Sequence, residues 1–456
     1  MLIWHFKRFN VRVFFKHMVF VNAFIFTGLF SCFLPFMLHD FADANEPSGR
    51  ILKLEDAYLL ALESNERIMI SEKEITKSRL LPRKALSVMM PVLSAEGKFV
   101  ESNESNEFAT IVFRPKNQLH ATFVMTQPVY RANYFPLKKQ ADVAVALSKD
   151  AYCQTAQNIL LKTARLYYDI LKEQALYKHT MEIKNLTEEE LMVSKVKFDA
   201  GAVTEDVVLN AELNISRAEA KLIEHKNNLE LARDMLWNLI GVEAQEYHLV
   251  EPVPKTTPIE DDNFLISKVF ENRHDYKIAV LNLQFAKYDK DLVKSGFHPT
   301  LEGGWYYDRS DEDTFNRDKE LWMASVVFKV PIFEGGLRFW ELKEKQTNIA
   351  QAELTLQDVK STITTEVQDV FLSVKTYHSI LSNLKKRLEL AQKKYEIIFS
   401  KFKFGSATST ELNEALMTLE SVKTELITKT YDYQYEILKL EKALGIFAQD
   451  YIKQAS

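Results

Sequence analysis

The chain has 456 residues, a net charge of −5, and only 12 glycines and 12 prolines, while 27% of its residues are charged. This balance favours long helices over an all-β fold, and neither the charge nor any basic patch indicates nucleic-acid binding. The only cysteines are Cys32 and Cys153, so no intrachain disulfide is possible if the segment that holds Cys32 is removed.

Residues 1–44 are predicted to be a signal peptide. Basic residues near the start precede an apolar run from Met18 to Leu38, and Ala42-Asp43-Ala44 offers a cleavage site. The alternative is an uncleaved segment, because the run is long enough to span a membrane. No later stretch approaches 18 uninterrupted apolar residues, so we expect an exported chain without a membrane-spanning helix.

Lipidation of Cys32 is a further alternative. Leu29-Phe30-Ser31-Cys32 loosely resembles a lipoprotein box. Phe30 is bulky for that position and the apolar run continues past Cys32, so cleavage after residue 44 is the preferred interpretation.

Residues 45–250 form a first predicted repeat, which consists of a helical stretch, two strands and a long helical hairpin. Steps of three and four between apolar residues predict the helices, and apolar–polar alternation predicts the strands. The elements are expected at about 52–88, 93–100, 119–127, 133–198, and from the turn at Gly201 to about Ile240.

A second predicted repeat, residues 263–446, follows a proline-rich linker at residues 251–262 and precedes a C-terminal tail at residues 447–456. Its helix, its two strands and its hairpin recur at nearly constant offsets from the first repeat. The strands are expected to begin near Leu301 and Trp322, and a helix of about 65 residues is expected to end near Phe404. Helices of this length extend about 100 Å, which suits a compartment-spanning structure better than a compact domain.

Each hairpin is predicted to reverse at a glycine. Gly201 and Gly405 differ by 204 in number, and each follows Lys-Phe-x-x and precedes a Thr three residues later. Glycine accepts the left-handed conformation that ends a helix, and the Thr is a good N-cap for the next helix. Thr408 and Glu411 also have the spacing of a capping box.

Each of the four predicted strands has one apolar or aromatic face. A globular sandwich would show the same alternation, but the export signal favours strands of an outer-membrane barrel. Four strands cannot close a barrel, and open edges in lipid are costly. Three chains would supply twelve strands, the smallest solution that leaves a channel.

The ordered set of motifs resembles the outer membrane factor (TolC-like) efflux and secretion channels over nearly all of the mature chain. The matching features are Leu54-Glu55-Asp56-Ala57, Ala61-Leu62-Glu63-Ser64-Asn65, Pro91-x-Leu93, Pro299-x-Leu301, Pro331-Ile332-Phe333-Glu334-Gly335-Gly336 and the two Phe-x-x-Gly-x-x-Thr turns. The resemblance implies a mainly α fold with a β-barrel part: a homotrimer with a 12-stranded outer-membrane barrel and a long antiparallel coiled-coil α-barrel.

The same resemblance implies location in the outer membrane of a Gram-negative bacterium, in contact with its lipid and extending into the periplasm. It implies short equatorial helices from the segment around residues 243–262 and from the tail. The implied role is a passive exit duct for drug and small-molecule efflux or type I protein secretion. The implied partners are a periplasmic adaptor (membrane fusion) protein and an inner-membrane pump of the RND or ABC type.

The resemblance places Glu411 and Glu414 at the periplasmic entrance, where three copies would form rings of negative charge. The alternative is that Glu411 caps its helix and Glu414 is a solvated surface acid. Polar links close the entrance in some family members. The side chains of Phe402 and Ala407 offer no such link, so the sequence does not identify the contacts that close this entrance.

Two further sets of residues are candidates. The tip residues would contact the adaptor, with plain turn chemistry as the alternative: Gly201, Ala202, Val203, Thr204, Gly405, Ser406, Ala407 and Thr408. Trp305, Tyr307 and Trp322 would form part of an aromatic girdle, with core packing as the alternative.

No catalytic constellation, cofactor motif or metal-ligand spacing stands out, so we expect no enzyme, no cofactor and no bound metal. The competing function is an exported coiled-coil scaffold without a pore. The sequence identifies neither the cargo nor the class of pump nor the adaptor.

Overall fold

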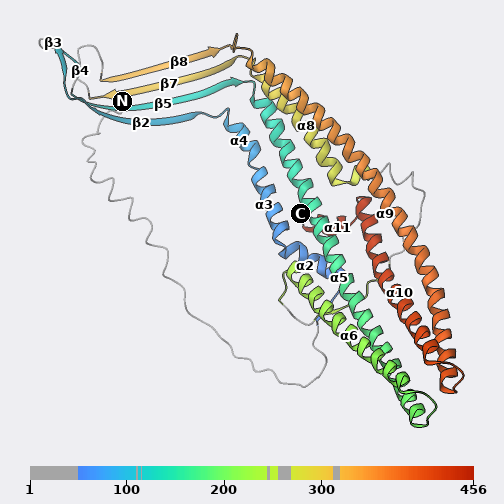
Figure 1. Cartoon of the computed structure of the whole chain (residues 1–456). Coiled ribbons are helices and arrows are strands. Elements are labelled where there is room, and N and C mark those ends of the chain that lie inside the picture. The colour runs from blue at the N-terminus through green and yellow to red at the C-terminus, as the bar shows by residue number, and fades with distance from the viewer. Residues whose placement is uncertain are drawn as a thin grey trace, which may run out of the picture. The chain divides into compact units, whose positions relative to one another are not determined.

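The computed structural model describes residues 50–108, 111–114, 116–243, 247–254, 269–311 and 319–455 (Figure 1). The predicted signal peptide with Cys32, and residues 255–262 of the predicted linker, lie outside these described residues. From residue 49 onward the chain forms one compact unit. None of the helices in the described part combines the length and apolarity needed to cross a bilayer.

The N-terminal helical stretch is interrupted rather than continuous. It consists of α2 (Leu54–Ser64), α3 (Glu66–Ser78) and α4 (Leu81–Ser87). The first break falls at Asn65, whose extended backbone ends α2 and whose side chain accepts a hydrogen bond from the Arg67 backbone N–H. Asn is a favoured N-cap residue, so Asn65 begins a new helix where the apolar spacing alone predicted continuity.

A short parallel pair of strands joins the two ends of the first repeat. β1 (Arg50–Leu52) pairs with β6 (Tyr247–Leu249). The Tyr167 hydroxyl lies 2.9 Å from the Leu52 carbonyl oxygen and 2.6 Å from that of Val250. Residues 247–249 therefore form a strand, where a short equatorial helix had been expected.

The four predicted strands form one antiparallel sheet in the order β2-β5-β7-β8. Its members are β2 (Val92–Glu101), β5 (Asn117–Arg131), β7 (Thr300–Ser310) and β8 (Glu320–Lys329). β5 was expected to end at Pro128 but continues to Arg131, because a bulge between Pro128 and Tyr130 accommodates the missing N–H of proline. In the part of the chain that follows β2 and precedes β5, β3 (Asn106–Phe108) pairs with β4 (Ile111–Arg114) and forms a separate two-stranded sheet.

The register of the sheet gathers the apolar residues on one face. Ala95 is paired with Phe123, Phe123 with Tyr307, and Tyr307 with Trp322, so one cross-strand row is apolar or aromatic throughout. In the neighbouring row, Glu96, Thr122 and Asp308 are paired on the opposite face. The alternation predicted strand by strand therefore adds up to one continuous apolar face.

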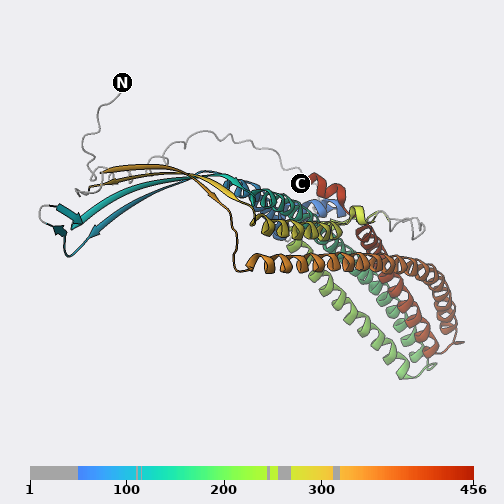
Figure 2. The same cartoon turned by 90° about the horizontal axis from the view of Figure 1, so that it is seen from above.

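The helices make two long hairpins. α5 (Tyr134–Asp199) reverses into α6 (Glu205–Ile240), and α9 (Leu337–Lys403) reverses into α10 (Ser409–Ala443). α8 (His274–Ser295) packs against both α5 and α9, and the tail carries α11 (Gln449–Ala455). Figures 1 and 2 show α10 running beside α5, so the second hairpin packs on the first.

Several apolar cores hold these helices together, and two of them involve α5. One lies where α2, α5, α6 and α11 meet, and there the ring of Tyr58 contacts that of Phe447 edge-on at 6.0 Å. The other lies near the hairpin turns and contains Ile183 of α5 together with Tyr395, Phe402 and Leu412 of the second hairpin.

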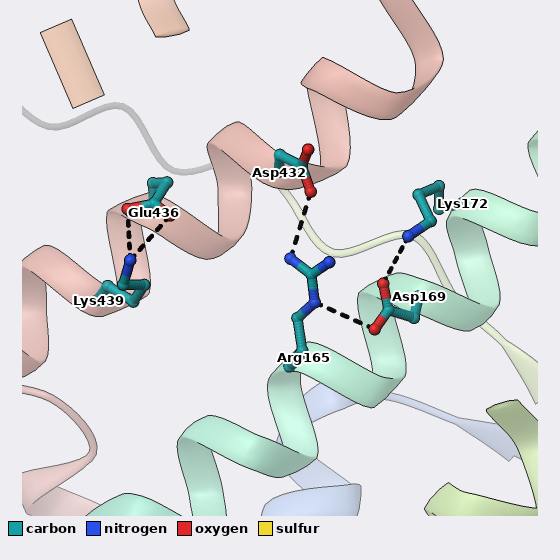
Figure 3. A network of polar contacts seen from close by, with 6 residues as sticks. All are labelled: Arg165, Asp169, Lys172, Asp432, Glu436 and Lys439. Atoms are coloured by element: carbon teal, nitrogen blue, oxygen red, sulfur yellow. Dashed lines mark hydrogen bonds and ion pairs between the residues drawn. The ribbon is translucent and has the colours of Figure 1, made fainter. Parts of the chain in front are cut away.

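A polar network also links the hairpins (Figure 3). Arg165 of α5 lies 3.1 Å from a carboxylate oxygen of Asp169 and 3.2 Å from one of Asp432 on α10. Lys172 approaches the other oxygen of Asp169 at 2.7 Å. Because Arg165 contacts acids on both helices, it links α10 to α5.

Candidate functional site

The two hairpin turns have nearly the same geometry. Gly201 has a φ of +69° and Gly405 a φ of +78°. The Ala202 N–H lies 2.8 Å from the Lys197 carbonyl oxygen, and the Ser406 N–H lies 2.8 Å from that of Lys401. These bonds satisfy helix-end carbonyls in the manner of a Schellman motif. The prediction of a glycine-dependent reversal in each repeat is confirmed.

The second turn carries the predicted capping box. The Glu411 N–H donates to the Thr408 hydroxyl at 3.2 Å, and the Thr408 N–H donates to Glu411 Oε2 at 2.8 Å. The Thr408 hydroxyl also donates to Glu411 Oε2, at 3.0 Å. The bonds that Oε2 accepts, first from the Thr408 N–H and then from the hydroxyl, lower the pKa of Glu411 below its ordinary value. The first turn differs, because the Thr204 hydroxyl bonds the Asp206 carboxylate instead.

Glu411 and Glu414 both lie on the exposed side of α10, one turn apart. Glu411 Oε2 is engaged in the cap, whereas the Glu414 carboxylate has no hydrogen bond or ion pair to any other described residue. The capping role foreseen for Glu411 is therefore present. The cap engages only Oε2 of Glu411, so the carboxylate can still contribute negative charge.

Lysines join the two hairpins close to their turns. Lys197 of α5 donates to the Phe402 carbonyl oxygen, and its ammonium lies 4.2 Å from the centroid of the Phe402 ring. Lys403 lies 2.7 Å from Glu189, and Lys423 pairs with Glu182. Sequence reasoning missed these links because it considered only the side chain of Phe402. A lysine near the last carbonyls of a helix is a known signal, but nothing local shows that it comes from the other hairpin.

The predicted adaptor-contact residues lie together at the ends of the hairpins. Ala202, Thr204, Ser406 and Thr408 are exposed, and Val203 and Ala407 are half-buried. The structure thus presents both tips, with small side chains, at the same end of the helices.

The three aromatic residues predicted to form a girdle lie together on the apolar face of the sheet. The rings of Trp305 and Tyr307 are stacked 6.1 Å apart at an angle of 7°, and Trp322 is the cross-strand partner of Tyr307. Trp322 is 68% exposed, which argues against the alternative of core packing within one chain.

The opposite face of the sheet carries polar pairs that sequence reasoning did not single out. Thr122 donates to Asp308 at 2.7 Å, and Arg131 Nη2 lies 2.6 Å from Glu302. Both pairs span β5 and β7. Their residues are far apart in sequence, so only the register between strands reveals the pairing.

The described residues contain no group of three or more His, Cys, Asp or Glu side chains that could hold a metal ion. Cys153 is half-buried, and burial raises the pKa of its thiol, which disfavours the reactive thiolate.

Residues 265–446 match the sequence profile of the outer membrane efflux protein family. The chain is 21% identical over 382 residues to the outer membrane protein TolC of Escherichia coli, covering 79% of this chain and 76% of that protein. The chain therefore resembles the TolC-like outer membrane factors.

Solved structures agree with this assignment at the level of the fold. The outer membrane channel CmeC of Campylobacter jejuni has a TM-score of 0.75 at 18% identity, covering 93% of this chain and 98% of that one. The outer membrane protein VceC of Vibrio cholerae has a TM-score of 0.72 at 15% identity, covering 86% and 96%. The mainly helical fold expected for the single chain, with its four-stranded sheet, is thus confirmed.

Proposed function

We propose that this chain works as a homotrimer that forms a passive exit duct. The observation that carries the proposal is the sheet, whose edge strands β2 and β8 each pair on one side only among the described residues. All ten residues of β8 are exposed. In lipid, unpaired backbone groups cost several kcal/mol each, so the edges need partners. Three copies would supply twelve strands and pair every edge.

The apolar face of the sheet would meet lipid, and Trp305, Tyr307 and Trp322 would form part of an aromatic girdle. The polar face, with Asp308 and Glu302, would line the water-filled interior. This orientation is supported by the exposure of the aromatic face and by the pairing of the polar residues with each other.

The hairpins would continue the duct into the periplasm, with the tips as the adaptor-contact surface. Small residues at positions 201–204 and 405–408 would allow close approach of another helical hairpin. The energy for transport would come from an inner-membrane pump of the RND or ABC type.

At the entrance, Glu411 and Glu414 would form acidic rings that favour cations. The lysine links from Lys197, Lys403 and Lys423 would hold the hairpins together in the closed form. Exposed ion pairs contribute only about 0.2 to 1 kcal/mol each, so a partner that binds the tips could break them.

The competing function, an exported scaffold without a pore, is tested by cysteine cross-linking across the edges of the sheet. With Cys153 replaced by Ser, a chain carrying Ser94→Cys on β2 is paired in turn with a single cysteine at each position from 323 to 329 on β8. The duct predicts an outer-membrane protein that yields covalent trimers for at least one register. A soluble protein without cross-linked species would support the scaffold.

The cargo is tested separately in a deletion strain. Sensitivity to dyes and detergents would indicate small-molecule efflux, and loss of a secreted polypeptide would indicate type I secretion.

A further inference from the structure

Glu190 is a buried acid on α5. It follows Glu188 and Glu189 in α5, which are both exposed, yet Glu190 is only 3% exposed. Its Oε2 atom has no hydrogen-bond partner among the described residues. A buried carboxylate without partners is costly in its charged form, so this position calls for an explanation.

Two other polar side chains share this environment. Ser194, one turn further along α5, is fully buried and its hydroxyl has no hydrogen-bond partner among the described residues. Tyr395 of α9 is 5% exposed with a similarly unpartnered hydroxyl, and it interacts electrostatically with Glu190. Glu190 and Ser194 of the first hairpin and Tyr395 of the second thus each have a buried oxygen atom without a hydrogen-bond partner among the described residues.

The surroundings offer Glu190 no counter-charge. The junction between the hairpins at this level is apolar and is formed by Ile183, Leu412, Ala415, Leu416 and Leu419, with Leu186 and Val193 packed against them. Desolvation is the cause that raises the pKa of Glu190 to about 7.

Several charged groups of α5, α6, α9 and α10 near this level are paired with residues other than Glu190. The engaged pairs are Glu189 with Lys403, Lys195 with Glu212, Arg217 with Asn214, Lys197 with the Phe402 carbonyl, Glu411 with Thr408, and Glu420 with Lys221. Tyr395 is the titratable group of α9 that faces Glu190.

A hollow lies beside Tyr395. It has a volume of about 320 Å³, and its lining includes Tyr395, His179, Glu182 and Lys423. His179 is itself 3% exposed, and its Nδ1 atom has no hydrogen-bond partner among the described residues. Tyr395 thus lines the hollow and also interacts electrostatically with Glu190.

We propose that Glu190 is a proton-binding switch at the junction of the two hairpins. It carries a proton while α5 packs against α9 and α10, and it releases the proton when the hairpins separate and water reaches the carboxylate. The inference deepens the proposed duct, and only its conductance test depends on that function.

The direction of the pH effect follows from linkage. The packed junction binds the proton more tightly than the separated hairpins do, because its carboxyl pKa is raised above the ordinary value of 4.5 to about 7. Packing is therefore fully favoured below pH 4.5, and the advantage is lost as the pH rises through about 7. Between these limits the equilibrium shifts up to about 10-fold per pH unit for each Glu190.

The proton is detected directly by infrared difference spectroscopy of the purified full-length protein in detergent, titrated from acid to alkaline pH. We expect a protonated carboxyl band that disappears near pH 7 and is absent from Glu190→Gln, a neutral variant of the same shape. The matched control Glu188→Gln removes an exposed carboxylate two residues away and should keep the band. A band that persists in Glu190→Gln, or its absence from the wild type, would overturn the proposal.

The consequence for gating is measured by conductance in planar bilayers. The wild type and Glu188→Gln should open increasingly from about pH 5 to about pH 8, whereas Glu190→Gln should stay closed and insensitive to pH. A pH response in Glu190→Gln equal to that of the wild type would refute the switch. A lack of conductance in all three proteins at every pH would refute the duct, and the infrared titration would still decide whether Glu190 binds the proton.

Discussion

The Lys197 ammonium lies over the ring of Phe402, so the first hairpin contacts the second close to their turns. The two repeats are not equivalent at this point. Phe402 is 1% exposed, whereas Phe198, its counterpart in the first repeat, is 43% exposed. The same Lys-Phe-x-x-Gly motif therefore forms a packed core in one hairpin and an accessible surface in the other.

This asymmetry predicts different outcomes for the same substitution. Phe402→Ala should destabilise the tips by about 3 to 4 kcal/mol, because it removes a fully buried ring. Phe198→Ala should cost about 1 kcal/mol, since much of its ring is already in water. Hydrogen exchange at the tips would measure both effects, and Phe402→Ala should also raise the basal conductance. Equal losses in the two variants would contradict the difference in packing.

The contact between Arg165 and Asp432 predicts a measurable coupling between the hairpins. A double-mutant cycle with Arg165→Met and Asp432→Asn should give about 1 kcal/mol by thermal unfolding, because both groups are partly shielded from water. The control is the Lys439–Glu436 pair of Figure 3, whose atoms approach to 2.9 Å within α10 alone. Its cycle should give no more than about 0.5 kcal/mol. The interpretation fails if the two couplings are the same.

The faces of the sheet predict a position-dependent tolerance of charge. Val326→Lys places an ammonium on the apolar face and should destabilise the folded protein by about 2 to 4 kcal/mol in a bilayer. Ser325→Lys changes the neighbouring residue on the polar face and should be nearly neutral. Unfolding by denaturant in lipid vesicles would measure both. A larger loss at position 325 would reverse the assignment of the faces.

The entrance acids predict a loss of ion selectivity. Glu411→Gln and Glu414→Gln should each lower the preference for cations in single-channel recordings, and the double variant should lower it further. Gln at position 411 still accepts the capping hydrogen bond, so the helix should remain intact by circular dichroism. Unchanged selectivity in the double variant would argue against the rings.

Local patterns in the sequence were sufficient for the long helices, the four strands and the two reversals. Gly201 and Gly405 take the left-handed conformation, and Thr408 and Glu411 form the capping box, because turn chemistry depends on a few neighbouring residues. The alternation also predicted that Phe123 and Tyr307 each lie on the apolar face of their strand, although it did not predict that the two residues are paired.

Contacts between distant segments could not be predicted in this way. β1 and β6 are three-residue strands too short to show a pattern, and Asn65 interrupts a helix whose apolar spacing continues. Glu190 follows two other glutamates, so the sequence pattern predicts a solvent-exposed side chain. Only the packing of α9 and α10 against α5 shows that it is buried.

The bonds from Tyr167 to the Leu52 and Val250 carbonyls have a mechanical consequence. They attach both ends of the first repeat to α5 at a point roughly 50 Å of helix away from Gly201, at about 1.5 Å per residue. The part of α5 between Tyr167 and Gly201 can therefore pivot about Tyr167. A tilt of α5 by a few degrees at Tyr167 moves the turn at Gly201 by several ångströms. A small rearrangement near Tyr167 therefore becomes a larger displacement at the hairpin turn.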